Sequence, residues 1–319
     1  MKHAIFAALG ASMLACGSAG AQDILFGSTS ASSSHYGYIV AVGKLINESG
    51  ADINATVVET GATMDNIRRM ERGQMDLGII TTNVVQHAVA GTQEFDGKPQ
   101  DLSLLWVYAP SPQNVIMRAD SGVESIAALD GVRINPGIKG SATETTTEAV
   151  FDVLGIKPDW VRGSTTDIVD AIKDNRLPGY VKSGSPKALD SSTMDLATAT
   201  DIRVLGLDPE QAERIREGMP DISIVDIAAG VGEGIPAYTT WSFGVGIAAT
   251  SAMSEETAYR IVKAVMEDKT VQGNAMASVK GEDLAQMTLD YATVPLHPGA
   301  LRWFEEQGMD VPAKLKPAM

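Results

Sequence analysis

Cysteine is almost absent from this chain, because the single one, Cys16, lies close to the N-terminus. The rest of the sequence therefore offers no disulfide and no thiol nucleophile. Positive charge is also scarce: 25 lysines and arginines stand against 40 aspartates and glutamates, for a formal net charge of -15. Nucleic acids and anionic membranes are negative themselves, so this balance argues against both as partners. An anionic ligand would need a site that is locally protected from the negative electrostatic field of the protein.

Long apolar runs are missing too, and only the N-terminus has a notable one. Lys2 and His3 precede the apolar stretch from Ala4 to Ala15, and a small-residue cleavage site ends at Ala21. This pattern predicts a cleavable signal peptide over residues 1–21. The segment MLACG around Cys16 offers lipidation as an alternative. No later run approaches the roughly 18 to 20 apolar residues of a transmembrane helix, so we expect an exported protein without direct membrane insertion.

The familiar signatures of enzymes and cofactor sites are also missing. The sequence contains no HExxH motif and no GxSxG motif, and His35, His87 and His297 are far apart. Gly91–Pro99 imitates a phosphate-binding loop but has five residues between its glycines and a proline after its lysine, while Ala229–Pro236 does not complete GxGxxG. We therefore expect a protein that is not an enzyme and has no cofactor and no metal. An exported hydrolase remains an alternative.

What the sequence does contain is an alternation of strand-like and helix-like patterns. Examples are ATVVET before TMDNIRRMERG, GVRINPG before SATETTTEAVFDVLG, and WSFGVGIAAT before SEETAYRIVKAVMED. Strands that alternate with helices of about ten to fifteen residues predict an α/β fold with a parallel sheet covered by helices. The 319 residues, 44% of them hydrophobic, suffice for two such domains or one large one. The segment from Leu102 to Met117 could cross from one lobe to the other.

Several predicted helices have well-marked starts. Ser141 and Ser164 each precede an acidic residue by three positions, which is the spacing of a capping box or close to it. Thr63 stands directly before another helical pattern. A hydroxyl at such a position can cap its own helix, so Ser141 and Thr63 each have a purely structural interpretation.

Five loops that lead from predicted strands into helices are rich in glycine and small hydroxyl residues. They are FGSTSASSSHYG, ETGATMDN, ITTNV, NPGIKGSATE and VKSGSP. In an open α/β sheet, ligands bind at the carboxyl ends of the strands, where such loops meet. Helix N-termini favour anions, and serine or threonine hydroxyls add donors without charge. Five loops of one kind therefore predict a shared site for a carboxylate.

Three of these segments, together with one near the C-terminus, resemble a known family. They are FGSTSASSSHYG, ETGATMDNIRRMERGQMDLGII, NPGIKGSATE and VPLHPGALRWFEEQG. The chain from about Ile24 to Gly308 resembles the substrate-binding subunit of TAXI-type TRAP transporters, most specifically in the last segment. We assign His297 of that segment a structural role in a turn between two prolines.

The resemblance implies a two-lobed periplasmic binding protein fold of the second type, with the ligand held in a cleft between lobes. Lobe 1 is expected to comprise residues 22–109 plus 241–319, and lobe 2 residues 110–240. The resemblance also implies a periplasmic protein that delivers a small organic acid to a membrane permease driven by an ion gradient. Ligands of this kind are glutamate, glutamine and 2-oxoglutarate-like acids. A binding component of an ABC importer would have the same fold and loops, so it remains an alternative.

Departures from the family pattern bear on the ligand. His35 stands where a tyrosine is usual, and two lysines, Lys139 and Lys182, are added near the expected cleft. Two extra cations favour a dicarboxylate or oxo-acid over glutamate, with one of them pairing with a second carboxylate. Tyr36 and Trp241 are expected to enclose its carbon chain. The residues expected to bind the ligand are Ser28, Thr29, Ser33, Ser34, His35, Tyr36, Gly61, Thr63, Asn83, Lys139, Gly140, Ser141, Thr143, Lys182, Ser185 and Trp241.

Overall fold

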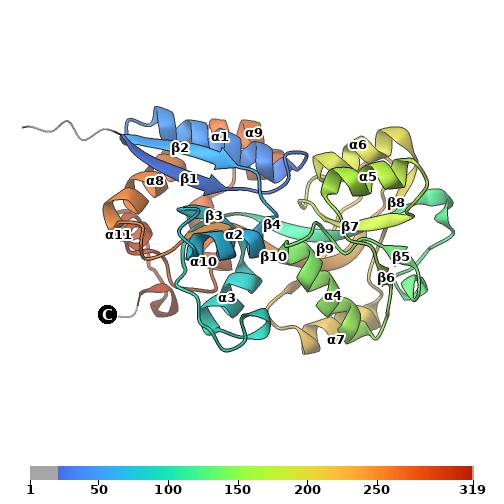
Figure 1. Ribbon diagram of the computed structural model, residues 1–319. Helices are drawn as coiled ribbons and strands as arrows, with labels where there is room; N and C mark the ends of the chain where they lie inside the picture. The colour runs from blue at the N-terminus through green and yellow to red at the C-terminus, as the bar shows by residue number, and fades with distance from the viewer. Residues whose placement is uncertain (1–20, 318–319) are drawn as a thin grey trace, which may run out of the picture.

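The computed structural model describes residues 21–317, which form two α/β lobes (Figure 1). The strands are β1 (Gln22–Gly27), β2 (Ile53–Val58), β3 (Leu77–Thr81), β4 (Ser103–Arg118), β5 (Arg133–Ile134), β6 (Asp159–Trp160), β7 (Gly179–Ser183), β8 (Ile202–Leu205), β9 (Ser223–Ile227) and β10 (Tyr238–Ala249). The helices are α1 (Ser34–Glu48), α2 (Thr63–Glu71), α3 (Thr82–Ala90), α4 (Ala142–Leu154), α5 (Thr165–Lys173), α6 (Ser191–Ala199), α7 (Pro209–Gly218), α8 (Glu255–Glu267), α9 (Val271–Ala275), α10 (Leu284–Tyr291) and α11 (Pro298–Glu306). The expected α/β class is confirmed.

The sheet of the first lobe has the strand order β2-β1-β3-β10-β4. Strand β1 runs parallel to β2 and β3, while β10 is antiparallel to both β3 and β4. The parallel part follows from the alternation of strands and helices in the first ninety residues, since each helix carries the chain back to the start of the next strand. The last four helices, α8 to α11, return to this lobe (Figure 1).

Two long strands, β4 and β10, join the lobes. Their middle parts pair with each other, as Ser242 with Pro112 and Val245 with Ala109. Beyond that, β4 continues into the second lobe and pairs with β7 and β8, while β10 pairs there with β9. The predicted crossing segment therefore does cross. The expected lobe boundaries, after residues 109 and 240, fall inside these two strands.

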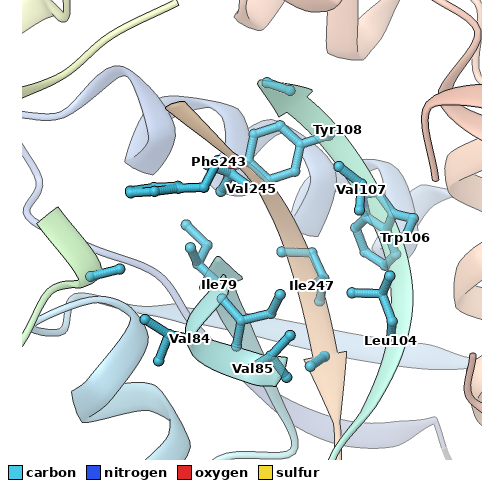
Figure 2. Packing of buried hydrophobic residues seen from close by; sticks show 14 of the residues in the cluster. Ile79, Val84, Val85, Leu104, Trp106, Val107, Tyr108, Phe243, Val245 and Ile247 are labelled. Carbon is cyan, nitrogen blue, oxygen red and sulfur yellow. The ribbon is translucent and has the colours of Figure 1, made fainter. Parts of the chain in front are cut away.

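The hydrophobic core is largest around the centre of the first lobe. Figure 2 shows side chains of β3, β10 and β4 packed in layers, among them Ile79, Ile247 and Trp106. A smaller cluster in the second lobe includes Ile116, Ile172 and Tyr180. Strands that are buried on both faces carry mainly apolar residues, as in β3 and in β10 from Phe243 onward.

The helix starts were predicted with one error. Ser141 accepts a hydrogen bond from the Glu144 N–H, and Ser164 accepts one from the Asp167 N–H, as capping residues do. Thr63 is instead the first residue inside α2, whose N-cap is Ala62, so the Thr63 hydroxyl does not cap its helix. At the other end of the chain, His297 caps α11 by accepting from the Gly299 N–H, which agrees with its structural assignment.

The predicted signal peptide and Cys16 lie outside the described residues, except for Ala21. Across residues 21–317, none of the helices combines the length and the apolar character needed to cross a bilayer.

Candidate functional site

A cavity lies between the two lobes, where the loops from both sides meet. Its empty volume is about 470 Å³. Sites for small molecules typically have volumes of roughly 300 to 1,000 Å³, so the cavity has room for a small ligand. The lining residues are Thr29, Ser33, His35, Ala62, Thr63, Ile79, Thr81, Ser111, Ile138, Ser141, Ala142, Thr143, Val181, Lys182, Ser183, Phe243 and Val245.

All five predicted loops contribute to this lining. The loops after β1, β2 and β3 reach it from the first lobe, and the loops before α4 and after β7 reach it from the second. The crossing strands supply its floor through Ser111, Phe243 and Val245. Figure 2 shows Phe243 and Val245 beside Tyr108 at the top of the packed core. The shared site expected from the five loops is thus one cavity.

Helix N-termini of both lobes face the cavity. Ser141 uses its hydroxyl to cap α4 at Glu144, which leaves the N–H groups of Ala142 and Thr143 without a partner inside the helix. On the opposite lobe, Thr63 opens α2 after Ala62, which adopts a left-handed backbone with φ of 68°. Two helix ends with free amide donors make the cavity favourable for a negative group.

Lys182 provides the positive charge of the site. It lies on β7 with only 8% of its side chain exposed, and its Nζ is 3.7 Å from Oδ1 of Asp190. That contact lies beyond hydrogen-bonding distance, and among residues 21–317 the ammonium group has no closer polar partner. A buried ammonium group with unused donors favours an anion in the adjoining cavity.

Asp190 is the N-cap of α6 and lies directly behind Lys182. Its Oδ1 accepts from the N–H and the hydroxyl of Ser192, at 3.0 and 2.6 Å, within the second lobe. Its Oδ2 accepts from the hydroxyl of Ser33 and the N–H of Ser34, both at 3.0 Å, across the cleft in the first lobe. Burial alone would raise the pKa of Asp190, but the charge of Lys182 and the bonds from Ser192 lower it below the usual value.

His35 closes the cavity beside Asp190. Its Nδ1 is 2.8 Å from the hydroxyl of Tyr108, and its ring is buried. Burial lowers the pKa of His35 to about 4, although Asp190 opposes the shift and Lys182 adds to it. The imidazole is therefore neutral near pH 7 and adds no charge to the site.

Further contacts hold the lobes together around the cavity. The Met64 N–H donates to the Gly140 carbonyl at 2.9 Å, and the Asn83 amide donates to Thr146 at 3.0 Å. Gly61 approaches the second lobe so closely that an added Cβ would lie 2.8 Å from the Lys139 carbonyl oxygen. The lobes are thus closed on each other.

The predicted site residues fall into three groups. The cavity is lined by Thr29, Ser33, His35, Thr63, Ser141, Thr143 and Lys182. The contact between the lobes, outside the lining, involves Ser34, Gly61, Asn83 and Gly140. The other five, Ser28, Tyr36, Lys139, Ser185 and Trp241, do not line the cavity, and Lys139 reaches the contact between the lobes only with its backbone carbonyl.

The last group corrects the sequence analysis. Lys139 is exposed and its side chain does not reach the cavity. Trp241 is fully buried in the hydrophobic core, so it cannot enclose a ligand in this state. Ser28 is buried behind the lining, and Tyr36 lies half-buried on α1 outside it. Ser185 bonds the Ala188 carbonyl in its own loop and lines a separate space.

Several lining residues and Asp190 were not predicted from the sequence. Asp190 carries a recognisable local signal, because an aspartate directly before SSTMDLATA has the position of an N-cap. Thr81 and Ser183 belong to predicted loops and could have been included on that ground. Phe243 and Ser111 carry no local signal, since their access to the cavity depends on the pairing of β4 with β10.

Metal binding finds no support in the described part of the chain. Residues 21–317 contain no cluster of three or more histidine, cysteine, aspartate or glutamate side chains placed to hold an ion. The donors that converge on the cavity are hydroxyls, amides and one ammonium group, which suit an anion.

Two crossing strands, a cleft between lobes and helix N-termini around it define the two-lobed fold of periplasmic binding proteins of the second type. A model of the NMT1-like family matches residues 26–308, so the chain belongs to that family. Among solved structures, the ligand-binding component of an ABC-type import system from Staphylococcus aureus is 12% identical, with a TM-score of 0.51 over 91% of this chain and 94% of that one. A structure described as a periplasmic transporter is 10% identical, with a TM-score of 0.55 over 91% and 98%. An ancestral arginine-binding protein bound to arginine is 15% identical, with a TM-score of 0.51 over 81% and 98%.

Proposed function

We propose that this protein is the solute-binding subunit of a TRAP transporter of the TAXI type, and that it captures a small organic acid between its lobes. In this proposal the protein is periplasmic, binds its ligand without chemical turnover and presents it to a membrane permease. The resemblance of the loop and C-terminal segments supports the transporter type. The fold shared with transport proteins supports the binding role.

The observation that best supports a carboxylate in the ligand is the position of Lys182. Its ammonium group lies at the wall of a cavity whose other donors are the free amides of Ala142 and Thr143 and the hydroxyls of Thr29 and Thr63. A carboxylate accepts several hydrogen bonds at once, and bonds to charged groups contribute about 1.5 to 3 kcal/mol each. The expected ligands were a dicarboxylate, an oxo-acid or a glutamate-like acid, and the carboxylate group common to them fits this arrangement.

The test is a calorimetric titration of residues 22–319 with a panel of small organic acids and amino acids. Lys182→Met should weaken binding of the best acid by 100-fold or more, because the ligand carboxylate loses its only buried cation. Lys139→Met is the matched control, since that exposed lysine should change the affinity less than twofold. Equal losses in both variants, or no binding of any acid, would overturn the carboxylate site.

The binding component of an ABC importer is the second candidate, favoured by the likeness to the Staphylococcus aureus import component. The two differ in the energy source of the partner permease. Reconstituted vesicles holding the partner permease should take up ligand when an ion gradient is imposed and no ATP is present. Uptake that needs ATP would favour the ABC importer instead.

A further inference from the structure

We infer that the ligand is a small monocarboxylate without an ammonium group, and that Asp190 sets this preference. This inference rests on the proposed function and narrows its ligand. It departs from the expectation of a dicarboxylate, which depended on two lysines in the cleft, because only Lys182 reaches the cavity.

The first argument is the charge of the site. Lys182 is the only charged side chain among the lining residues, and Asp190 already stands 3.7 Å from its Nζ. His35 is neutral at pH 7 because burial lowers its pKa to about 4. Lysine and aspartate together carry no net charge, so one ligand carboxylate can share the unused donors of Lys182. A second carboxylate would be buried without a cation.

The second argument concerns a ligand ammonium group, which needs a carboxylate or several free acceptors. The lining contains no aspartate or glutamate. Asp190 lies close by, but its two oxygens already accept four hydrogen bonds, from Ser33, Ser34 and twice from Ser192. An α-amino acid would therefore bury its ammonium group beside Lys182 with no anionic partner.

The third argument is the shape and polarity of the remaining space. The lining also has apolar side chains, among them those of Ile79, Val181, Phe243 and Val245. The empty volume of about 470 Å³ lies at the small end of the range of ligand sites, which suits a small organic acid. The hydroxyls of Thr63 and Thr81 can donate hydrogen bonds to one neutral oxygen of the ligand, such as that of a 2-oxo group.

The experiment compares ligands of equal carbon count by calorimetry on residues 22–319: butyrate, 2-oxobutyrate, 2-aminobutyrate and succinate. We expect butyrate or 2-oxobutyrate to bind at least 30-fold more tightly than succinate and 2-aminobutyrate. Tighter binding of succinate or 2-aminobutyrate would overturn the inference and leave the proposed function standing. Failure of all organic acids in the wider panel would overturn the proposed function itself.

A variant tests the part played by Asp190. Asp190→Asn keeps the shape of the side chain and removes its charge, so Lys182 is left unbalanced. We expect the preference for butyrate over succinate to shrink at least tenfold, whereas the exposed control Asp195→Asn should leave it unchanged. An unchanged preference in Asp190→Asn would refute the role of Asp190. The comparison of ligands on the unsubstituted chain decides the ligand class even where this variant does not fold.

Discussion

Among the hydrogen bonds that join the two lobes, the one from the Ser33 hydroxyl to Asp190 should contribute strongly to closure. The two residues are 157 positions apart, and their oxygens are 3.0 Å apart in a buried contact across the cleft. Ser33→Ala removes this donor. The Ser34 N–H remains as the other donor from the first lobe to the same oxygen.

The size of the effect follows from the charge of the acceptor. A hydrogen bond to an ionised group contributes about 1.5 to 3 kcal/mol, and each 1.4 kcal/mol changes an equilibrium tenfold. The ratio of closed to open molecules should therefore fall by about 10- to 100-fold. Ser33 also caps α1 through the His35 N–H, so loss of the cap should lower the free energy of unfolding by about 1 kcal/mol as a separate effect.

The assay is single-molecule fluorescence transfer between dyes on Lys44→Cys in the first lobe and Glu217→Cys in the second. No other cysteine remains after the predicted signal is removed, so the labelling is specific. Ser192→Ala is the matched control, because the Ser192 hydroxyl donates to the same carboxylate at 2.6 Å from within the second lobe. It should lower stability and leave the closed fraction nearly as it was.

Two outcomes would refute this reasoning. One is a closed fraction in Ser33→Ala equal to that of the unsubstituted chain. The other is equal opening in Ser33→Ala and Ser192→Ala, which would mean that the carboxylate acts by ordering the second lobe and not by joining the lobes.

Two further predictions concern the same closed state. Gly61→Ala places a Cβ 2.8 Å from the Lys139 carbonyl oxygen of the second lobe. Ligand affinity should therefore fall at least tenfold, while the melting temperature without ligand changes little. An unchanged affinity would contradict the close approach of the two lobes at Gly61. The pKa of His35 is about 4 when folded and 6.5 at its ordinary value, so the unfolded chain takes up the proton first. Stability should fall by about 3 kcal/mol as the pH falls from 6.5 to 4, measured by urea unfolding, and His35→Gln should remove most of this dependence.

The loops of the site could be predicted because their signals are local. A strand, a glycine or small hydroxyl, and a helix start lie within a dozen residues, and the open-sheet rule then places their ends at one edge. The expectation of two lobes came from the resemblance and not from these patterns. The capping serine of α4 was predicted correctly, while the N-cap of α2 was placed one residue too late, at Thr63 instead of Ala62, because helix ends are marked less sharply than helix bodies.

The side chains that fail the prediction depend on distant parts of the chain. Lys139 and Lys182 have similar sequence surroundings, yet one points to solvent and the other is buried beside Asp190. Trp241 lies on a crossing strand, where the pairing with β9 and the packing of the core decide which face it takes. Asp190 had a visible capping position, but its approach to Ser33 requires the lobes to close and cannot be deduced from the sequence near either residue.

The position of β10 between β3 and β4 has a consequence for the order of folding. Residues 1–237 contain all of the second lobe's internal pairing except its contact with β10, whereas the first lobe has a gap in the middle of its sheet until residues 245–249 are made. A chain that is synthesised from its N-terminus to its C-terminus cannot complete this sheet until late. Strand pairings between residues so far apart in sequence are also slow to form. One edge of the apolar strand β3 therefore stays unpaired while more than 150 further residues are synthesised. A protein that binds and shields this edge during synthesis would raise the yield of folded protein.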